Sequence, residues 1–390
     1  MKAQPIQERE RIVVLDIIRG LAIFGILLVN MPTFFAPFLY IEPRKYWTST
    51  IDLWSYNFVD IVAQASFYTL FSFLFGYGFV IFTKRLEEKQ LSVPKYFSRR
   101  LVVLLLIGIF HAFLIWHGDI LITYAIIGFL LLLLRNLSSK TMVWTGILLL
   151  VIPNALISLM LLVTVSLGLT DGVYEEFQIY ATQSLEVYSN GTFLEVTMQR
   201  IADWSFANVN AFIFIIFSIL PMFLFGAALA KAKWLEIMEE KAGAFKKLWA
   251  ISVVGTLIFK LLPYYSSANE FTEYVQDIFG GPFHALFYFT SVVLLVRNKT
   301  WLKLLSPLRY VGRMSLSNYL FQSIVCTTIF YSYGFGLYGQ ITLITGLIAC
   351  FILFVIQIFI SKWWVNRFYY GPVEWLWRVG TYGRKQPFRR

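Results

Sequence analysis

Charged residues are scarce in this chain: they make up 14% of its 390 residues, against about one-quarter in an ordinary soluble domain. Cysteine is nearly absent as well, and Cys326 and Cys350 both lie inside apolar runs. The sequence therefore predicts neither a disulfide framework nor a CxxC metal site. It also contains no P-loop, HExxH pair or GxSxG elbow. These absences remove the common signatures of nucleotide binding, zinc hydrolysis and serine hydrolysis.

Long apolar runs dominate what is present, because 58% of the residues are hydrophobic. Runs of about eighteen or more apolar residues are typical of membrane spans, and the run from Leu101 to Trp116 continues into Ile120 to Leu134. The sequence predicts an all-α integral membrane protein with about ten transmembrane helices. The segment 12–35 lacks a cleavage site and is predicted to be a retained first span. The predicted spans lie near residues 12–36, 53–83, 98–116, 119–134, 141–168, 207–230, 246–263, 282–297, 313–332 and 340–361.

Positive charge is distributed unevenly among the loops. The net charge is +11, and basic residues gather in the N-terminal arm, in every second loop and in the tail, whereas the other loops carry Arg44, Lys45, Arg200 and little else that is positive. This alternation follows the positive-inside rule and predicts that both termini are cytoplasmic. Because the charge lies in short patches between spans, the expected partner is the lipid bilayer and no nucleic acid is expected.

The chain is predicted to be one polytopic membrane domain over residues 1–390, with two notable segments outside the spans. An acidic outer loop, about 170–206, carries Asp171, Glu175 and Glu176, and its apolar residues recur at helical spacing. Short helices lying on the outer surface are therefore expected there. The second segment is a basic cytoplasmic tail, about 362–390. No internal repeat of the kind that marks many transporters is visible.

The stretch FHAFLIWHGDILITYA, residues 110–125, places polar residues inside an apolar region. Gly118 suits the left-handed position after a helix end, Asp119 is a good N-cap for the next helix, and His117 suits a helix C-terminus. His111 lies six residues deeper than His117, about 9 Å at the helical rise. Two interpretations of His111 remain open: a buried structural histidine, or a catalytic or proton-handling histidine in a pocket that opens outward.

The first span, VLDIIRGLAIFGILLVNM, pairs Asp16 with Arg19 at i, i+3, and Asn30 returns to nearly the same helical face. One interpretation is an intrahelical ion pair near the cytoplasmic interface, with Arg19 extending toward water. The other is an arginine inside the bundle that receives an anionic group such as a phosphate.

Two further spans carry polar stripes. In the second, Asp60, Gln64, Tyr68 and Ser72 repeat every four residues, and Gly76 and Gly78 would permit close helix contact. The ninth begins GRMSLSNYLFQS, in which Arg313 is followed by Asn318 and Gln322 on one face with Ser315, Tyr319 and Cys326. Asp60 as a cap and the ninth-span residues as hydrogen-bonding contacts between helices are the structural interpretations. Alternatively, the stripes together line one cavity, because exposing them to lipid is costly.

The sequence resembles a known family. The segments VLDIIRGLAIFGILLVN, GIFHAFLIWHGDILITYAIIG, NGTFLEVTMQRIADW, GRMSLSNYLFQS and YGPVEWLWR are similar to the YeiB-like bacterial multi-pass membrane proteins, which are known by a domain of unknown function. The likeness covers nearly the whole chain. It implies residence in the bacterial cytoplasmic membrane, and that family has been associated with transport.

The opening LDxxRGxA also resembles that of transmembrane acyltransferases, including heparan-glucosaminide N-acetyltransferase and bacterial O-acyltransferases. In those enzymes an acyl group passes from cytosolic acyl-CoA to a hydroxyl or amine on the far side. They place an essential histidine at the end of the first span or in the following loop, and residues 30–60 here contain none. The likeness implies that His111 takes that role. The matching positions are Leu15, Asp16, Arg19, Gly20, Ala22, Val29 and Asn30.

The leading hypothesis is an acyltransferase-like membrane protein. Asp16 and Arg19 would bind the acyl-CoA donor, and His111 would act as general base, oriented by Asp119 or Asp60. No permanently bound cofactor or metal is expected, and acyl-CoA would be a co-substrate. The first alternative is a small-solute or proton-coupled transporter whose path the same stripes line, and the second is a non-catalytic membrane partner or sensor. The remaining residues assigned to substrate binding are Asn30, Gln64, Arg200, Arg313, Asn318 and Gln322.

Overall fold

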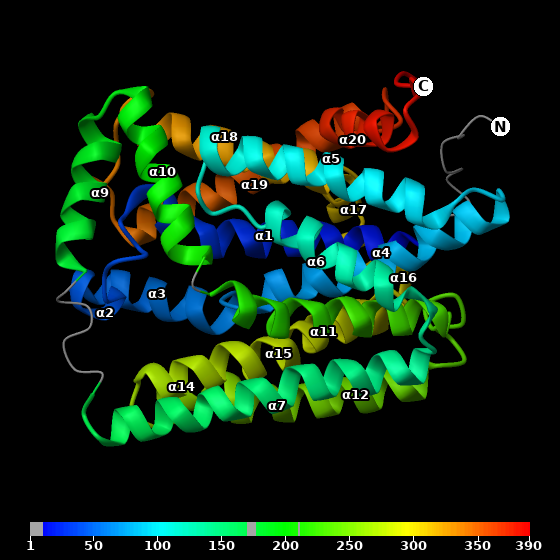
Figure 1. Ribbon diagram of the computed structural model, residues 1–390, viewed down its shortest axis with the longest axis horizontal. Coiled ribbons are helices and arrows are strands. Elements are labelled where there is room, and N and C mark those ends of the chain that lie inside the picture. The colour runs from blue at the N-terminus through cyan, green and yellow to red at the C-terminus, as the bar shows by residue number, and fades with distance from the viewer. Residues whose placement is uncertain (1–10, 170–176, 210) are drawn as a thin grey trace.

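The computed structural model describes residues 11–169, 177–209 and 211–390, and every regular element in these ranges is a helix. The helices run mainly along the long axis of the molecule (Figure 1). Eight helical segments of the described ranges, some of them runs of consecutive helices, are long and apolar enough to cross a membrane. The all-α membrane fold predicted from composition is therefore confirmed. These eight are α1 (Val13–Phe35), α3 and α4 (Thr50–Val62 and Ser66–Glu88), α5 (Val93–Leu114), α7 (Ser139–Ser166), α11 (Phe212–Lys231), α12 with η3 (Ala242–Gly255 and Thr256–Lys260), α14, η4 and α15 (Glu270–Val275, Gln276–Gly280 and Gly281–Leu295), and α19 (Leu343–Val365).

Two of the predicted spans are shorter helices. The helix α6 (Leu121–Leu133) has 13 residues, and α18 (Ser315–Phe330) has 16. At the helical rise they extend about 20 Å and about 24 Å, less than the roughly 30 Å hydrocarbon core of a bilayer. Both carry or adjoin the polar residues singled out from the sequence.

The short elements gather at the two ends of the bundle. At one end, here called the cap end, lie α2 (Pro43–Tyr46), α9 (Gln178–Asn190), α10 (Phe193–Asn208) and α13 (Leu262–Tyr265). The helices α2 and α9 lie at the left of Figure 1. The pair α9 and α10 confirms the short helices expected in the acidic loop, whereas Asp171, Glu175 and Glu176 lie outside the described residues. The charge pattern predicts that the cap end faces outward.

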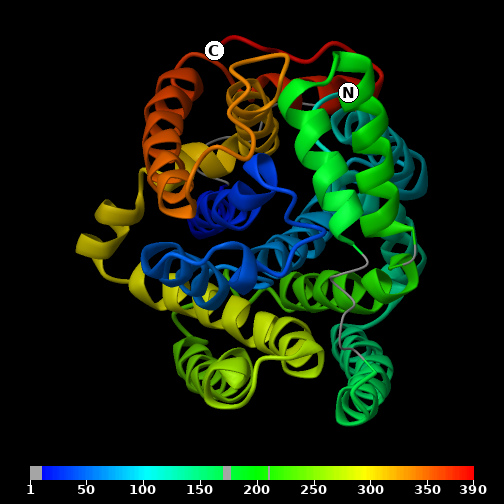
Figure 2. The same ribbon diagram turned by 90° about the vertical axis from the view of Figure 1, so that its left-hand side faces the viewer.

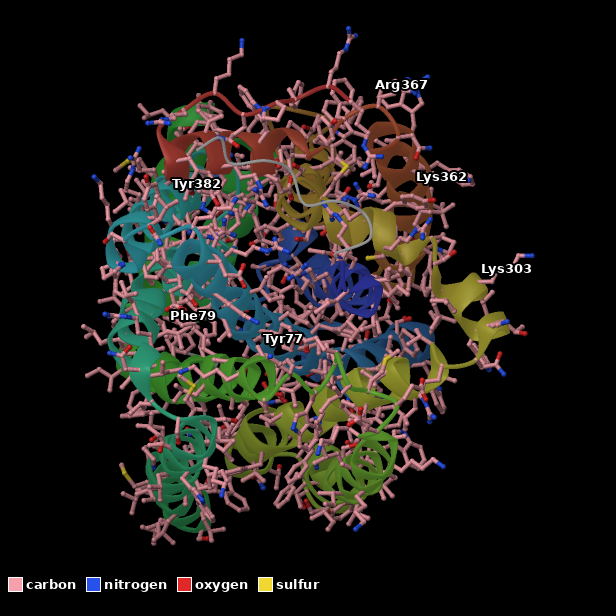
Figure 3. All side chains as sticks on the ribbon, turned by 90° about the vertical axis from the view of Figure 1, so that its right-hand side faces the viewer. Tyr77, Phe79, Lys303, Lys362, Arg367 and Tyr382 are labelled. Carbon is pink, nitrogen blue, oxygen red and sulfur yellow. The ribbon has the colours of Figure 1, made fainter. Side chains whose placement is uncertain are left out.

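The opposite end, here called the terminal end, holds η2 (Leu134–Asn136), α16 (Lys299–Leu305), α17 (Leu308–Arg313) and α20 (Pro372–Tyr382). Figure 3 looks onto this end: Lys303, Lys362 and Arg367 lie at the rim, and Tyr77 and Phe79 lie among the helices. This is the end that the positive-inside rule predicts to be cytoplasmic.

The helix α1 lies among the other helices when the molecule is viewed from the cap end (Figure 2). Of the eight candidate spans in the described ranges it is the most buried, because 67% of the residues in its 18-residue apolar stretch are buried. Glycines let its neighbours approach closely: a Cβ on Gly20 would overlap the Leu308 carbonyl, and one on Gly312 would overlap the Asp16 carbonyl. In the same way, Gly76 of α4 and Gly226 of α11 let these two helices approach each other closely, because a Cβ on either glycine would overlap the backbone of the other helix.

The predicted span 53–83 is not one continuous helix. The chain turns at residues 63–65, where Ala65 has a φ of 58°, and resumes as α4 at Ser66. Consequently Asp60 and Gln64 do not share a straight helical face with Tyr68 and Ser72. The carbonyls released by the break find other donors, because Val62 accepts from the Tyr288 hydroxyl at 2.8 Å and Gln64 accepts from Lys260 Nζ at 3.0 Å.

Candidate functional site

His111 lies on the last turn of α5 with both ring nitrogens engaged. Its Nδ1 is 2.8 Å from Asp119 Oδ1, and its Nε2 is 2.9 Å from the Oγ of Ser323 on α18. His111 and Ser323 are fully buried, and Asp119 is 6% exposed. These three residues, here called the His111 triad, come from two helices and the loop between α5 and α6. A carboxylate, an imidazole and a hydroxyl bonded in this order match the orienting group, the base and the nucleophile of a catalytic triad.

The loop 115–120 fixes Asp119 in place. Asp119 was predicted to be the N-cap of the next helix, but the N-cap residue of α6 is Ile120. Asp119 Oδ2 still accepts the backbone N–H of Ile122 in the first turn at 2.8 Å, and its Oδ1 lies beside His111. The predicted left-handed conformation of Gly118 is wrong, because Gly118 does not have a positive φ. Glycine is required there for space instead: a Cβ would overlap the Trp116 ring. The Gly118 carbonyl accepts the Tyr319 hydroxyl at 3.0 Å, which joins the loop to α18.

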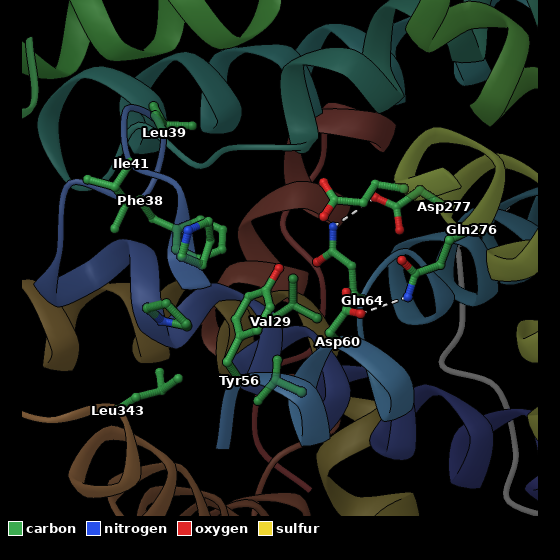
Figure 4. Close-up of a pocket in the computed structure, with 14 residues that line it drawn as sticks. Val29, Phe38, Leu39, Ile41, Tyr56, Asp60, Gln64, Gln276, Asp277 and Leu343 are labelled. Carbon is green, nitrogen blue, oxygen red and sulfur yellow. Dashed lines mark hydrogen bonds between the residues drawn. The ribbon is translucent and has the colours of Figure 1, made fainter. Parts of the chain in front are cut away.

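A cavity of about 200 Å³ lies at the cap end (Figure 4). Asp60 Oδ2 accepts the Tyr264 hydroxyl at 2.6 Å and the Gln276 amide at 2.7 Å, and Gln64 donates to Asp277 Oδ2 at 3.0 Å. Here this cavity is called the acidic pocket. It is lined by Val29, Pro32, Phe38, Leu39, Ile41, Pro43, Tyr56, Val59, Asp60, Gln64, Glu273, Gln276, Asp277 and Leu343.

The helix α1 separates the acidic pocket from the His111 triad. Val29 and Pro32 face the pocket, whereas Phe34 packs against Trp116 at 4.1 Å between ring centroids, and Trp116 contacts His111. Phe34 lies about 140° round the helix from Val29 and about 160° from Pro32. The structure therefore does not bring Asp60 together with His111 in one cavity. Asp119, and not Asp60, is the carboxylate beside the histidine.

The ninth-span residues form contacts between helices. Asn318 donates to Ser361 Oγ at 3.0 Å, Gln322 donates to Gln357 at 2.9 Å, and the Gln357 amide donates back to the Asn318 carbonyl at 3.0 Å. Gln322 also reaches the Ile23 carbonyl on α1 at 3.4 Å. These bonds fix α18 to α19 and α1, and they correspond to the structural interpretation of that stripe.

At the terminal end, Asp16 pairs with Arg19 at 3.1 Å and with Arg11 at 3.5 Å. The predicted ion pair along α1 is thus present, and the Arg19 side chain remains 27% exposed. Asn30 is half-buried farther along α1, and Arg313 is half-buried at the end of α17. Glu374 of α20 accepts the backbone N–H groups of Leu316 and Ser317, and so satisfies the first turn of α18.

Arg200 and His117 hold the α9–α10 pair onto the bundle. Arg200 is fully buried and donates to the Leu114 carbonyl at 3.1 Å and to the Tyr333 hydroxyl at 2.9 Å. It does not line the acidic pocket. Tyr188 donates to Asp203 at 2.6 Å and lies 3.3 Å from His117 Nδ1. Burial lowers the pKa of His117, although the nearby Asp203 carboxylate acts in the opposite direction. Burial raises the pKa of Tyr188.

Ser323, Lys260 and Asp277 were not anticipated from the sequence. Lys260 had the clearest signal, since an ionisable residue within the apolar run TLIFKLL is costly in a membrane and marks a candidate site. Ser323 had none of its own, because a serine on a polar helix face resembles an ordinary interhelical contact.

Comparison with known proteins relates the chain to bacterial proteins along nearly its whole length. Residues 229–384 match the family described as "Protein of unknown function (DUF418)". The chain is 37% identical to the uncharacterized protein YxaH of Bacillus subtilis, over 99% of this chain and 98% of that one. It is 30% identical to the uncharacterized protein YeiB of Escherichia coli, over 95% and 96%. The chain therefore belongs to the YeiB-like family of proteins of unknown function (DUF418).

Proposed function

We propose that this chain is a membrane-embedded acyltransferase of the bacterial cell membrane in which the His111 triad performs the proton transfers. The observation that carries the proposal is a fully buried histidine bonded by a carboxylate at one nitrogen and by a hydroxyl at the other. Asp119 would set the tautomer of the ring, so that Nε2 is free to accept a proton from Ser323.

The reaction is proposed to proceed in two steps. His111 Nε2 takes the proton from Ser323 Oγ, which attacks the thioester carbonyl of acyl-CoA. The C–S bond breaks, and the thiolate leaves with the proton from His111. An acceptor hydroxyl or amine then gives a proton to His111 and attacks the acyl-serine ester, and the released Ser323 oxygen recovers that proton.

The donor would enter from the terminal end. Arg19 is a partly exposed cation there, and a guanidinium binds phosphate through charge-assisted hydrogen bonds. From Arg19 to Phe34, which packs against the Trp116 beside the triad, α1 rises about 22 Å. The thioester arm of the donor would follow this length of α1 to Ser323. The LDxxRGxA opening shared with acyltransferases supports the same assignment of Asp16 and Arg19.

The test uses purified full-length protein in lipid nanodiscs and acetyl-CoA. Acetyl-CoA should raise the midpoint of thermal unfolding, because a ligand that binds only the folded state stabilises it. Mass spectrometry of the quenched protein should find an acetyl group on Ser323, absent in Ser323→Ala. His111→Ala should lose at least about 10²-fold in the rate of acetylation while still binding the donor.

His284→Ala is the matched control, because His284 is also buried and bonded to a serine, Ser66, at 3.1 Å, but has no carboxylate partner in the described structure. Its rate of acetylation should be unchanged. Absence of a thermal shift with several acyl-CoAs at millimolar concentration would contradict the proposal, as would acetylation that persists in His111→Ala.

Small-solute transport is the second candidate function, and a different observation favours it. The acidic pocket adjoins three interruptions of regular helix: the break at residues 63–65 and the π-helical turns η3 and η4. Interrupted helices beside a polar cavity are typical of the binding sites of secondary transporters. Flux of a solute into proteoliposomes that is lost in Asp60→Asn and retained in His111→Ala would favour transport over acyl transfer.

A further inference from the structure

We propose that the acidic pocket binds a small organic cation: a protonated amine on a short apolar frame. This site is separate from the His111 triad, and the inference does not rest on acyl transfer.

The ionisable residues around the pocket favour a cation. Asp60, Glu273 and Asp277 line it, and two basic side chains lie nearby, so carboxyl groups outnumber basic groups by one. Lys260 Nζ is 3.9 Å from Asp277 and donates to the Gln64 carbonyl, and Arg44 stacks on Tyr56. Neither basic residue is among those that line the cavity.

Asp60 is the carboxylate that a ligand would complete. It is only 8% exposed, and the two donors to its Oδ2, the Tyr264 hydroxyl and the Gln276 amide, are both neutral. An ionised carboxylate at such burial costs free energy unless a cation or several hydrogen bonds compensate it. An ammonium group in the pocket would provide that compensation beside a preformed set of hydrogen bonds.

The rest of the lining fits the frame of the ligand. Val29, Ile41 and Leu343 supply aliphatic surface, and Phe38 and Tyr56 supply aromatic rings, on which an ammonium is attracted to the π face. The volume of about 200 Å³ lies below the range of roughly 300–1,000 Å³ for drug-sized ligands, so the ligand is small. A metal ion does not fit as well: within the described ranges, no three His, Cys, Asp or Glu side chains are close enough to hold one.

Close backbone contacts give the pocket a fixed shape. A Cβ on Gly280 would lie 2.7 Å from the backbone of Lys260, and one on Gly281 would lie 2.9 Å from the Ala65 Cβ. The turns η3 and η4 and the break between α3 and α4 are therefore packed against one another. Irregular backbone at membrane depth is stable where protein buries it or where it lines a cavity, and π-helical turns are frequent at functional sites.

The experiment compares two probes of the same shape on the full-length protein in nanodiscs. Cyclohexylamine is charged at neutral pH, and cyclohexanol is not. We expect cyclohexylamine to raise the midpoint of thermal unfolding and to bind saturably in equilibrium dialysis, while cyclohexanol at the same concentration does neither. Equal effects of the two probes, or no binding of the amine, would overturn the proposal.

Three variants locate the site. Asp60→Asn should weaken amine binding at least tenfold. Leu39→Trp fills the cavity without changing a charge and should also prevent binding, which guards against a folding defect specific to Asp60→Asn. Glu42→Gln removes the same charge from a side chain next to the lining residues Ile41 and Pro43 but outside the pocket, and it should bind as wild type. Amine binding that is unchanged in both Asp60→Asn and Leu39→Trp would place the cation elsewhere and overturn the inference.

Two further measurements separate an acyl acceptor from a transported solute. With acetyl-CoA present, N-acetylcyclohexylamine formed by wild type and not by Asp60→Asn would identify the amine as an acceptor. Asp60-dependent flux of labelled amine into proteoliposomes would identify it as a solute. Either result supports the cation site. Failure of the cation-site proposal is distinguishable from failure of the acyl-transfer proposal, because His111→Ala should still bind the amine.

Discussion

The His111 triad and the acidic pocket lie on opposite sides of α1. They differ in the regularity of the helices that carry their ionisable groups and in the hydrogen-bond partners of those groups. In the triad, His111 and Ser323 come from regular helices and are fully buried, and each hydrogen-bonding atom of the imidazole is satisfied within the set. In the pocket the helices are interrupted, and Asp60 is satisfied by neutral donors. In the proposed functions, the triad moves a proton between fixed partners, whereas the pocket receives a ligand.

The difference has an energetic basis. A buried group whose partners are all within the protein needs no ligand to be stable, so its chemistry is preorganised. In the proposed cation site, an open pocket lined by carboxyl groups would be stabilised when the ligand binds. The two regions should therefore respond differently to substitution: changes in the triad should affect rate, and changes in the pocket should affect binding and stability.

The largest effect is expected from Asp119→Asn. The asparagine oxygen can still accept the Ile122 N–H in the first turn of α6, but its amide group faces His111 Nδ1 and favours the wrong tautomer. If the triad acts as proposed, the acyl transfer rate should fall about 10³- to 10⁴-fold with little change in thermal stability. Initial rates and the unfolding midpoint of the same preparation test this. A large loss of stability with an unchanged rate would show that Asp119 serves only the first turn of α6.

On the pocket side, Asp277→Asn should act on stability. It leaves Lys260, whose side chain is fully buried, without its carboxylate partner. We expect a loss of about 3 kcal/mol, the lower end for breaking a buried ion pair, because the Asp277 side chain is 34% exposed. Unfolding in mixed micelles measures it. The double variant Asp277→Asn/Lys260→Met should recover part of the loss, and a double variant less stable than either single one would contradict the pairing.

Local pattern predicted much of the fold and one edge of the candidate site. Apolar runs located the long helices, and the sequence HGDIL placed Asp119 at the start of the next helix, near His111. Both depend only on neighbouring residues, which is the information that periodicity and capping rules use. The pair His111 and Asp119 is separated by eight positions, so local geometry was sufficient to bring it together.

The remaining features depend on tertiary packing. Ser323 reaches His111 across 212 positions, and only the docking of α18 against α5 shows it. The break at 63–65 has no proline or glycine to mark it, since the segment reads AQA, and the turns η3 and η4 continue helical patterns. The prediction that all polar stripes line one cavity was wrong, because α1 lies between the acidic pocket and the His111 triad. The pocket contacts Val29 and Pro32, and the triad region contacts Phe34.

A smaller effect should distinguish two glycines on α4. A Cβ on Gly76 would overlap the backbone carbonyl of Phe223, which no side-chain rotation can relieve, whereas one on Gly78 would meet only the Arg19 side chain at 3.6 Å. Gly76→Ala should therefore cost about 1–3 kcal/mol of stability, and Gly78→Ala should change it by less than about 0.5 kcal/mol. Thermal unfolding of the two variants side by side tests this. Equal losses would mean that the close packing of α4 on α11 does not depend on Gly76.

The smallest effect is a pH dependence at the cap end, in the loop that carries Asp119. Burial lowers the pKa of His117 below its usual value of about 6.5, so the unfolded chain binds its proton more readily than the folded one. The contribution of neutral His117 to stability is thus present above about pH 6.5 and is lost as the pH falls below that value. His117→Asn should lower the unfolding midpoint at pH 8, and its difference from wild type should shrink toward pH 5. A difference that stays constant or widens on acidification would show that His117 is not held neutral against Tyr188 and Asp203, and that the cap does not weaken in acid through this residue.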